Sequence, residues 1–213
     1  MTREEKYNIA ITEDVLGRQE CLDPKSLNLL TYSRPGDVCD RFESGRLGNM
    51  AGGFHFDLLG MRWRSSEHLY LCGEWSRDDD QCIEAQQYIR MMPSGAWAKR
   101  CSKANYGTYI RDDFASFRLQ WMLWCVWQKC LLNMDFAALL KSVPDDVVIV
   151  EVEKNDPVWA AQPDEDGILH GGNAMGKILT ICRRHLLNGT APNIDTALLN
   201  ASSIHILGQR IQF

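Results

Sequence analysis

The chain has 213 residues, a formal net charge of −5, 45% apolar residues and 24% charged residues. These values are those of a globular protein of one domain, and they exclude disordered and low-complexity classes. The acidic balance also argues against a protein that coats nucleic acid through clustered Lys and Arg, although it does not exclude an enzyme that takes one nucleotide into a pocket.

The sequence lacks the features of membrane, secreted and zinc-binding proteins. The most apolar window, Trp121 to Trp127, is far shorter than the roughly 20 residues of a membrane span. The N-terminus is charged and has no apolar signal core. The eight cysteines form no CxxC pair and no Cys/His cluster. We therefore expect a cytoplasmic protein with reduced thiols, no metal and no membrane partner.

The predicted elements begin with a polar, proline-punctuated segment over residues 1–45, an irregular arm or small lobe. A glycine-rich loop over 45–53 follows, where the backbone must come close to another group. Apolar spacing and capping residues then predict four helices, over residues 65–75, 78–92, 94–104 and 115–141.

The second half of the chain contains one clear strand. The β-branched run over 147–152 predicts a buried strand, and a loop is expected over 153–172. A strong helix is expected from Asn173 to Leu187, ended by Gly189. The expected fold is mostly α and multihelical, with a few short strands. Its expected parts are the arm 1–45, a main domain 46–189 and a C-terminal extension 190–213 packed on that domain.

One segment matches a phosphate-binding loop incompletely. Residues 171–177 fit GxxxxGK, but Ile178 stands where a Mg²⁺-binding hydroxyl is needed, which argues against a nucleotide triphosphatase. Two glycines before a helix, with Asn173 at its cap, could leave free N–H groups for an anion such as pyrophosphate. The same residues also make an ordinary turn and cap, and the sequence leaves both interpretations open.

Lys129 stands out because its helical neighbours are apolar. Met122, Cys125, Val126 and Leu132 lie one or two turns away. A lysine on such a face either extends its ammonium group to water or is desolvated. Desolvation lowers a lysine pKa and frees the amine for nucleophilic or Schiff-base chemistry. The sequence alone favours the first of these interpretations.

Two acids and one tryptophan are further candidates. Glu67 lies in the first turn of a helix, where the helix dipole stabilises any carboxylate. Asp156 precedes a proline in a loop and is a common turn former. Trp159, in the same polar loop, either packs on the core or stacks on a base or ribose.

Read in order, these segments resemble the NADAR or YbiA-like superfamily. The resembling motifs are SSEH at 65–68, DPVW at 156–159 and GNAMGKIL at 172–179, which is followed by Arg183. The glycine-rich residues 48–53 and the Ala98-Lys99 dipeptide resemble the branch of antitoxins to guanine-specific ADP-ribosyltransferases.

The resemblance implies a domain that binds ADP-ribose-like ligands and hydrolyses an N-glycosidic bond without a metal or cofactor. In the antitoxin branch this bond joins ADP-ribose to guanine in nucleic acid, and in another branch it lies in riboflavin-pathway intermediates. The implied partners are an ADP-ribose-containing ligand, ADP-ribosylated nucleic acid and a toxin.

The resemblance also implies roles for single residues. Glu67 would be the acid/base or ribose-orienting carboxylate, and either Lys129 or Lys99 would attack the anomeric carbon. Asp156 would help to form the pocket. Asn173 and Gly176 would hold the pyrophosphate. The full set of implied binding residues is Asn49, Trp75, Trp159, Gly172, Asn173, Gly176 and Arg183.

Three positions depart from the family pattern. Glu74 stands where the family has Lys or Arg before an aromatic residue. Asp113 is followed by Phe114 where the family has tryptophan, and Ala160 replaces the family's glycine after Trp159. The reversed charge at Glu74 leaves two alternatives open, a non-catalytic ADP-ribose or NAD-binding module and a protein that binds a toxin through residues 1–45.

Overall fold

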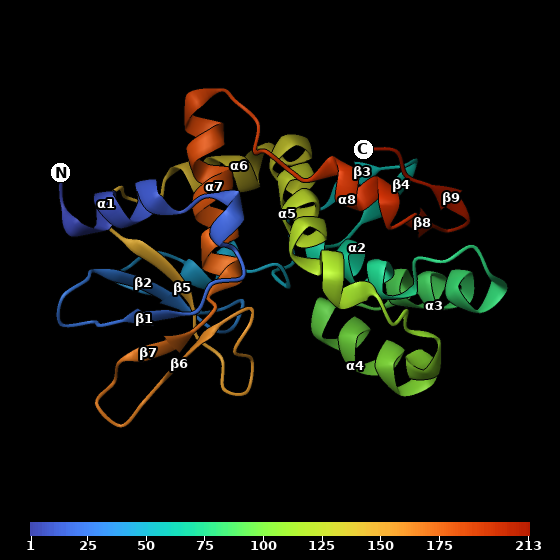
Figure 1. Ribbon diagram of the computed structural model, residues 1–213, viewed down its shortest axis with the longest axis horizontal. Helices are drawn as coiled ribbons and strands as arrows, with labels where there is room; N and C mark the ends of the chain where they lie inside the picture. The colour runs from blue at the N-terminus through green and yellow to red at the C-terminus, as the bar shows by residue number, and fades with distance from the viewer. The chain divides into compact units, whose positions relative to one another are not determined.

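The computed structural model describes residues 1–213, which form eight α-helices and nine short strands. The chain divides into two compact units (Figure 1). Unit 1 comprises residues 1–51 and 134–193, and unit 2 comprises residues 52–133 and 194–213. The predicted fold class, mostly α with a few short strands, is confirmed. The domain boundaries near residues 45 and 189 stay a prediction.

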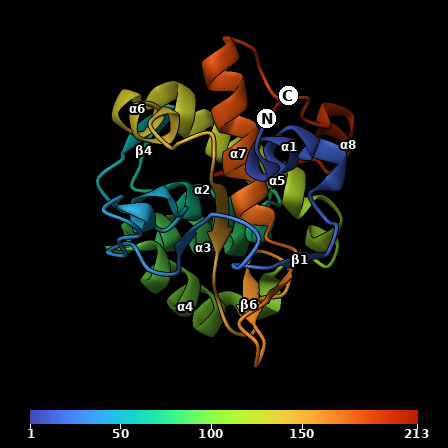
Figure 2. The same cartoon turned by 90° about the vertical axis from the view of Figure 1, so that its left-hand side faces the viewer.

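Unit 1 combines two small sheets with three helices. The order β1–β7–β6 makes an antiparallel sheet, and β2 pairs in parallel with β5. Helix α7 packs against β5 and α6 (Figure 2). The elements are α1 Arg3–Ala10, β1 Glu20–Leu22, β2 Leu29–Tyr32, α6 Met134–Lys141, β5 Val148–Glu151, β6 Ala161–Pro163, β7 Leu169–Gly171 and α7 Ala174–Asn188.

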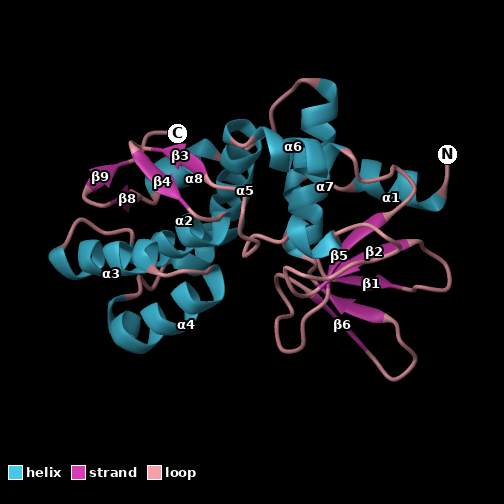
Figure 3. Ribbon diagram, turned by 180° about the vertical axis from the view of Figure 1, so that it is seen from behind, coloured by secondary structure: helices cyan, strands magenta, loops and turns pink.

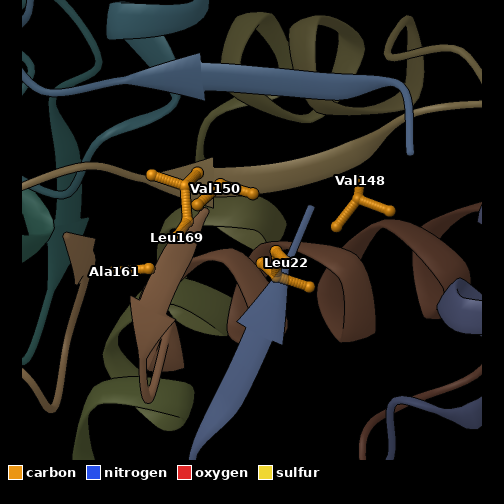
Figure 4. Packing of buried hydrophobic residues seen from close by; sticks show 5 residues of the cluster. All are labelled: Leu22, Val148, Val150, Ala161 and Leu169. Atoms are coloured by element: carbon orange, nitrogen blue, oxygen red, sulfur yellow. The ribbon is translucent and has the colours of Figure 1, made fainter. Parts of the chain in front are cut away.

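An apolar cluster holds the strands of unit 1 together (Figure 4). Val148 and Val150 are alternate residues of β5, so their side chains leave the same face of the strand. They pack with Leu22 of β1, Ala161 of β6 and Leu169 of β7. Each strand is too short to be stable alone, and this shared burial stabilises the pairing.

The close packing of α7 on β5 depends on one glycine. A side chain at Gly176 would overlap the carbonyl oxygen of Ile149, at the centre of β5. Only glycine allows the helix backbone to lie this near to the strand.

Unit 2 is built mainly from helices (Figure 3). Two hairpins turn through residue pairs with positive φ, Leu59-Gly60 and Leu207-Gly208, as tight two-residue turns require. The elements are β3 Phe56–Leu58, β4 Met61–Trp63, α2 Ser66–Cys72, α3 Asp80–Met91, α4 Gly95–Tyr106, α5 Phe114–Leu132, α8 Thr196–Ala201, β8 His205–Ile206 and β9 Gln209–Arg210.

Helices α2 and α5 pack tightly in unit 2. The indole Nε1 of Trp121 on α5 donates to the carbonyl of Tyr70 at 3.0 Å, and a side chain at Gly73 would overlap that same indole. The buried amide of Gln86 on α3 joins this region to the C-terminal hairpin. It donates to Trp75 O at 2.8 Å and to His205 O at 2.9 Å.

Three expectations about local structure were wrong. Residues 1–45 are not irregular, because they contain α1, begun by a Thr2 capping box, and strands that pair with β5 and β7. The expected loop over 153–172 contains β6 and β7, which distant pairing stabilises. The long helix breaks at Asn133, whose backbone is extended and whose amide donates to His55 O at 2.8 Å. No helix has both the length and the apolar character needed to cross a membrane.

Candidate functional site

Helix α2 begins with polar residues that are nearly all removed from water. Ser65, Ser66, Glu67 and His68 are each at most 2% exposed. Ser65 was expected to cap the helix with its hydroxyl. The hydroxyl makes no capping hydrogen bond and instead lies 2.8 Å from His68 Nδ1. His68 Nε2 lies 3.2 Å from Met92 O, and because a carbonyl only accepts, Nε2 carries the proton. Burial also lowers the pKa of His68. The His68 ring therefore links Ser65, at the start of α2, to Met92, directly after α3.

Glu67 lies in the first turn of α2, a helix that packs against α5, and is 2% exposed. Burial raises the pKa of the Cys125 thiol on α5, and the charges of Cys72 and Glu67 add to the rise. Burial likewise raises the pKa of Tyr70, with the Glu67 carboxylate contributing. Glu67 therefore lies within electrostatic reach of both helices.

Lys129 follows Cys125 by one turn of α5 and is 0% exposed. Its Nζ lies 5.5 Å from the ring centroid of Phe54. The interpretation in which its ammonium reaches water is therefore wrong, because the residues before β3 cover this end of α5. The α2–α5 seam, defined by Glu67, Cys125 and Lys129, thus buries a carboxyl group and an amine in one region of unit 2.

The reversed charge at Glu74 is surrounded by cations. Its carboxyl group is buried and lies 3.3 Å from Lys103 Nζ of α4. Burial raises the pKa of Glu74, while Lys103, Lys99 and Arg118 act in the opposite direction. Lys99, the second candidate nucleophile, is half-buried beside this cluster.

Trp75 belongs to the core of unit 2. Its side chain is fully buried, and its Nε1 donates to Tyr106 O at 2.9 Å. The ring has no exposed face for a ligand in this structure, and its predicted binding role has no support from its position.

In unit 1, the backbone N–H groups at the start of α7, which were candidates for binding an anion, are already hydrogen-bonded within the protein. Four successive N–H groups donate to the carbonyls of residues 157–160 at 2.8–3.2 Å. The donors are those of Gly172, Asn173, Ala174 and Met175. The interpretation of this helix start as a set of free donors is wrong, because the preceding turn folds over it.

Asn173 and Lys177 both have structural partners. Asn173 has a left-handed backbone with φ of 43°. Its side chain accepts from Glu151 N at 3.1 Å and donates to Ile149 O at 3.0 Å, which ties α7 to β5. Lys177, the lysine of the GxxxxGK match, is buried and donates to Val15 O and Arg18 O. Its amine does not point into solvent, where it could contact a phosphate group.

Asp156 and Trp159 form the turn that covers α7. Asp156 Oδ1 accepts from Trp159 N at 3.1 Å, the bond of a turn-forming Asp. Trp159 is half-buried. The structure therefore brings Asp156, Trp159, Gly172 and Asn173 together as one local unit.

Asn49 and Arg183 line two different hollows of unit 1. Asn49 lines a hollow of about 30 Å³ with Tyr32 and Glu151. Arg183 lines another of about 340 Å³, where it pairs with Asp145 at 2.8 Å. Because α7 rises about 1.5 Å per residue, Arg183 lies about 15 Å along the helix from Asn173. Arg183 and Asn173 therefore cannot both bind one small group such as a pyrophosphate.

The predicted site residues divide between the units. Glu67, Lys99, Lys129 and Trp75 belong to unit 2, and the others belong to unit 1. The Ser65–His68 bridge was not predicted, although contact between an N-cap residue and the residue three positions later is a common pattern at the start of a helix. No group of three or more His, Cys, Asp or Glu side chains is arranged to hold a metal ion.

Among solved structures, the chain is similar to the NMR structure of the E. coli protein YbiA. The TM-score is 0.57 at 23% sequence identity, over 76% of this chain and 86% of that chain. No protein-family model matches the sequence, and no curated protein matches it. The chain therefore has a YbiA-like fold, and the resemblance inferred from its motifs is confirmed at the level of the fold.

Proposed function

We propose that the chain is an N-glycosidase that hydrolyses the bond between ADP-ribose and a guanine base of nucleic acid, or a related nucleotide-like N-glycoside. The observation that carries the proposal is the burial of Glu67 and Lys129 in the α2–α5 seam. Charged groups are rarely buried without a function or a partner, and an acid together with an amine suits glycoside chemistry. The YbiA-like fold supports the same assignment.

The reaction uses each group in a defined way. Burial removes water from an amine and favours its neutral, nucleophilic form. The Lys129 amine attacks the anomeric carbon while the bond from that carbon to the base nitrogen breaks, and the Glu67 carboxyl group delivers a proton to the departing base. The sugar ring opens to give an imine, and water then hydrolyses the imine to release ADP-ribose and free lysine. The reaction consumes one water molecule.

The binding roles of Asn49, Asp156, Trp159 and Arg183 belong to this proposal. The adenine and ribose rings of ADP-ribose offer faces on which an indole such as Trp159 can stack. Gly172, Asn173 and Gly176 contribute indirectly, because they hold the turn that contains Trp159 against β5.

The test is the release of free ADP-ribose from an ADP-ribosylated guanine oligonucleotide. Glu67→Gln should lower turnover by about 10²–10⁴-fold, the range for loss of a general acid/base. Glu43→Gln, a change at an exposed glutamate of unit 1, is the matched control and should retain full turnover. Unchanged turnover in a folded Glu67→Gln protein would show that Glu67 has no part in catalysis.

Glu74 favours one alternative, a binding module that holds ADP-ribose or NAD without turnover. The negative charge of Glu74 opposes an anionic ligand, and Lys103, at 3.3 Å, offsets part of that charge. Calorimetry with ADP-ribose, run beside the release assay, separates the two functions. Binding without product from the unaltered protein would favour the module.

A further inference from the structure

A long stretch of unit 2 carries only positive charge. Residues 85–111 contain five basic residues and no acidic one, in a chain whose net charge is −5. Helix α4 lies within this stretch and holds three of the five, Lys99, Arg100 and Lys103. Such a local concentration of cations can attract an anionic partner that the acidic chain as a whole would repel.

The outer side of α4 presents an aromatic ring beside these cations. Trp97 is 55% exposed, Arg100 is exposed and the Lys103 side chain is 46% exposed. They follow one another at intervals of three residues, so they form one slanted line along the helix. We call these three residues the α4 ridge. The opposite side of the helix is buried through Ala98 and Ser102, which fixes the direction in which the ridge faces.

The acids nearest to the ridge do not cancel its charge. Glu74 pairs with Lys103 at 3.3 Å and is itself buried, while Lys99 and Arg118 lie within reach of the same carboxyl group. Glu84 of α3, which accepts a hydrogen bond from the Tyr106 hydroxyl at 3.0 Å, keeps its negative charge, so these two acids stand against the cations Lys99, Arg100, Lys103 and Arg118. The positive charge of Arg100 and the surplus around Glu74 therefore remain on this side of unit 2.

We propose that the α4 ridge is a docking surface for single-stranded nucleic acid. Cations that contact phosphates and an exposed ring that stacks on bases are the two components of such surfaces. An unpaired strand fits better than a duplex, because the base faces of a duplex are already stacked on one another. That the docked strand carries the base to be cleaved rests on the proposed function, whereas the docking itself does not.

The first test measures binding of an unmodified, fluorescein-labelled oligothymidine strand to the full chain by fluorescence anisotropy. Trp97→Ala should weaken binding by about 5- to 150-fold, the usual effect of losing one stacked base. Arg100→Gln should make the slope of log K against log salt less steep by about 0.7, the value for one phosphate contact on a single strand. Arg62→Gln, at an exposed arginine of β4, is the control and should change neither quantity.

Three results would overturn the docking surface. They are failure of the unaltered protein to bind the strand, unchanged binding by both ridge variants, and equally tight binding of polyglutamate with no effect of Trp97→Ala. Circular dichroism spectra of the variants that match those of the unaltered protein show that the fold is retained.

The second test separates this inference from the proposed function. Trp97→Ala should raise KM for an ADP-ribosylated strand and leave KM for ADP-ribosylated guanosine unchanged. Strand binding that depends on the ridge, without turnover of either compound, would reject the N-glycosidase and leave the docking surface in place. Turnover of both compounds with KM values that do not respond to Trp97→Ala would reject the ridge as the substrate-docking surface.

Discussion

The start of α7 in unit 1 and the α2–α5 seam in unit 2 differ in how well their sequence patterns predict a functional role. The first has the glycines and the lysine of a phosphate loop, yet its N–H groups bond to residues 157–160 and Lys177 bonds to carbonyl groups. The second reads as apolar packing, yet it buries Glu67 and Lys129. A motif of small residues can therefore serve packing alone, whereas a charged residue inside an apolar pattern marks a place to look for chemistry.

The largest expected effect is the presence or complete absence of a covalent adduct between the sugar and a lysine of the α2–α5 seam. Borohydride reduces an imine to a stable amine, so reduction during turnover should fix the sugar to the nucleophilic lysine. Lys129→Met should abolish this adduct, and Lys99→Met, the matched change on α4, should leave it in place. Peptide mass spectrometry identifies the modified residue. An adduct on Lys99, or an adduct that survives Lys129→Met, would move the chemistry away from the seam.

At the start of α7, the largest expected effect is on stability. Gly176→Ala should lower the free energy of unfolding by about 3 kcal/mol, because its side chain has no room against Ile149 O. Gly107→Ala is the control, since a side chain there meets no atom within 4 Å. Urea denaturation measures both variants. An unaffected Gly176→Ala protein would show that α7 and β5 are not packed as closely as described.

Lys177 tests whether the GxxxxGK match has any ligand role. Lys177→Met should lower the free energy of unfolding by about 2–3 kcal/mol, because it removes hydrogen bonds to Val15 O and Arg18 O and leaves the nearby Glu20 without its cation. Thermal denaturation with and without ATP provides the measurement. Stabilisation by ATP that is lost in the variant, with little change in stability otherwise, would restore the phosphate-loop interpretation.

The smallest expected effect depends on pH and concerns Glu74. Burial raises the pKa of Glu74, so its stabilising contribution is complete below its ordinary pKa and is lost as pH rises through the raised pKa. Glu74→Gln removes this titration. The stability of the variant should therefore rise relative to that of the unaltered protein when the pH is raised from about 4 to about 7. Urea denaturation at both pH values gives this difference, and a constant difference between the two proteins would contradict it.

Much of the helical structure was predictable, because helices are encoded locally. Ser94 and Asp79 cap α4 and α3, and Gly189 ends α7 in the left-handed conformation, as their sequence signals indicate. Strands β1, β6 and β7 are three residues each and carry no such signal. They exist because residues far apart in the chain pair with one another, and such partners cannot be read from one sequence.

The candidate site was predictable in part. The sequence identified Lys129 as a charge among apolar neighbours, and the structure adds that its amine is buried. The sequence could not tell free N–H groups from engaged ones at the start of α7, because their acceptors lie in the turn at 157–160, whose position depends on the fold. For the same reason, the pairing of the buried Glu74 with the exposed Lys103 could not be foreseen.

The alternation of the two units along the chain has a consequence for synthesis. The ribosome delivers part of unit 1, then most of unit 2, then the rest of unit 1, and finally residues 194–213. The helices of unit 2 are translated well before residues 194–213. The hydrogen bond from the Gln86 amide to His205 O therefore forms only after this last segment has been synthesised. A nascent chain released before that segment emerges would expose the surfaces that α8 and the last hairpin cover, and would be a ready target for chaperones and proteases.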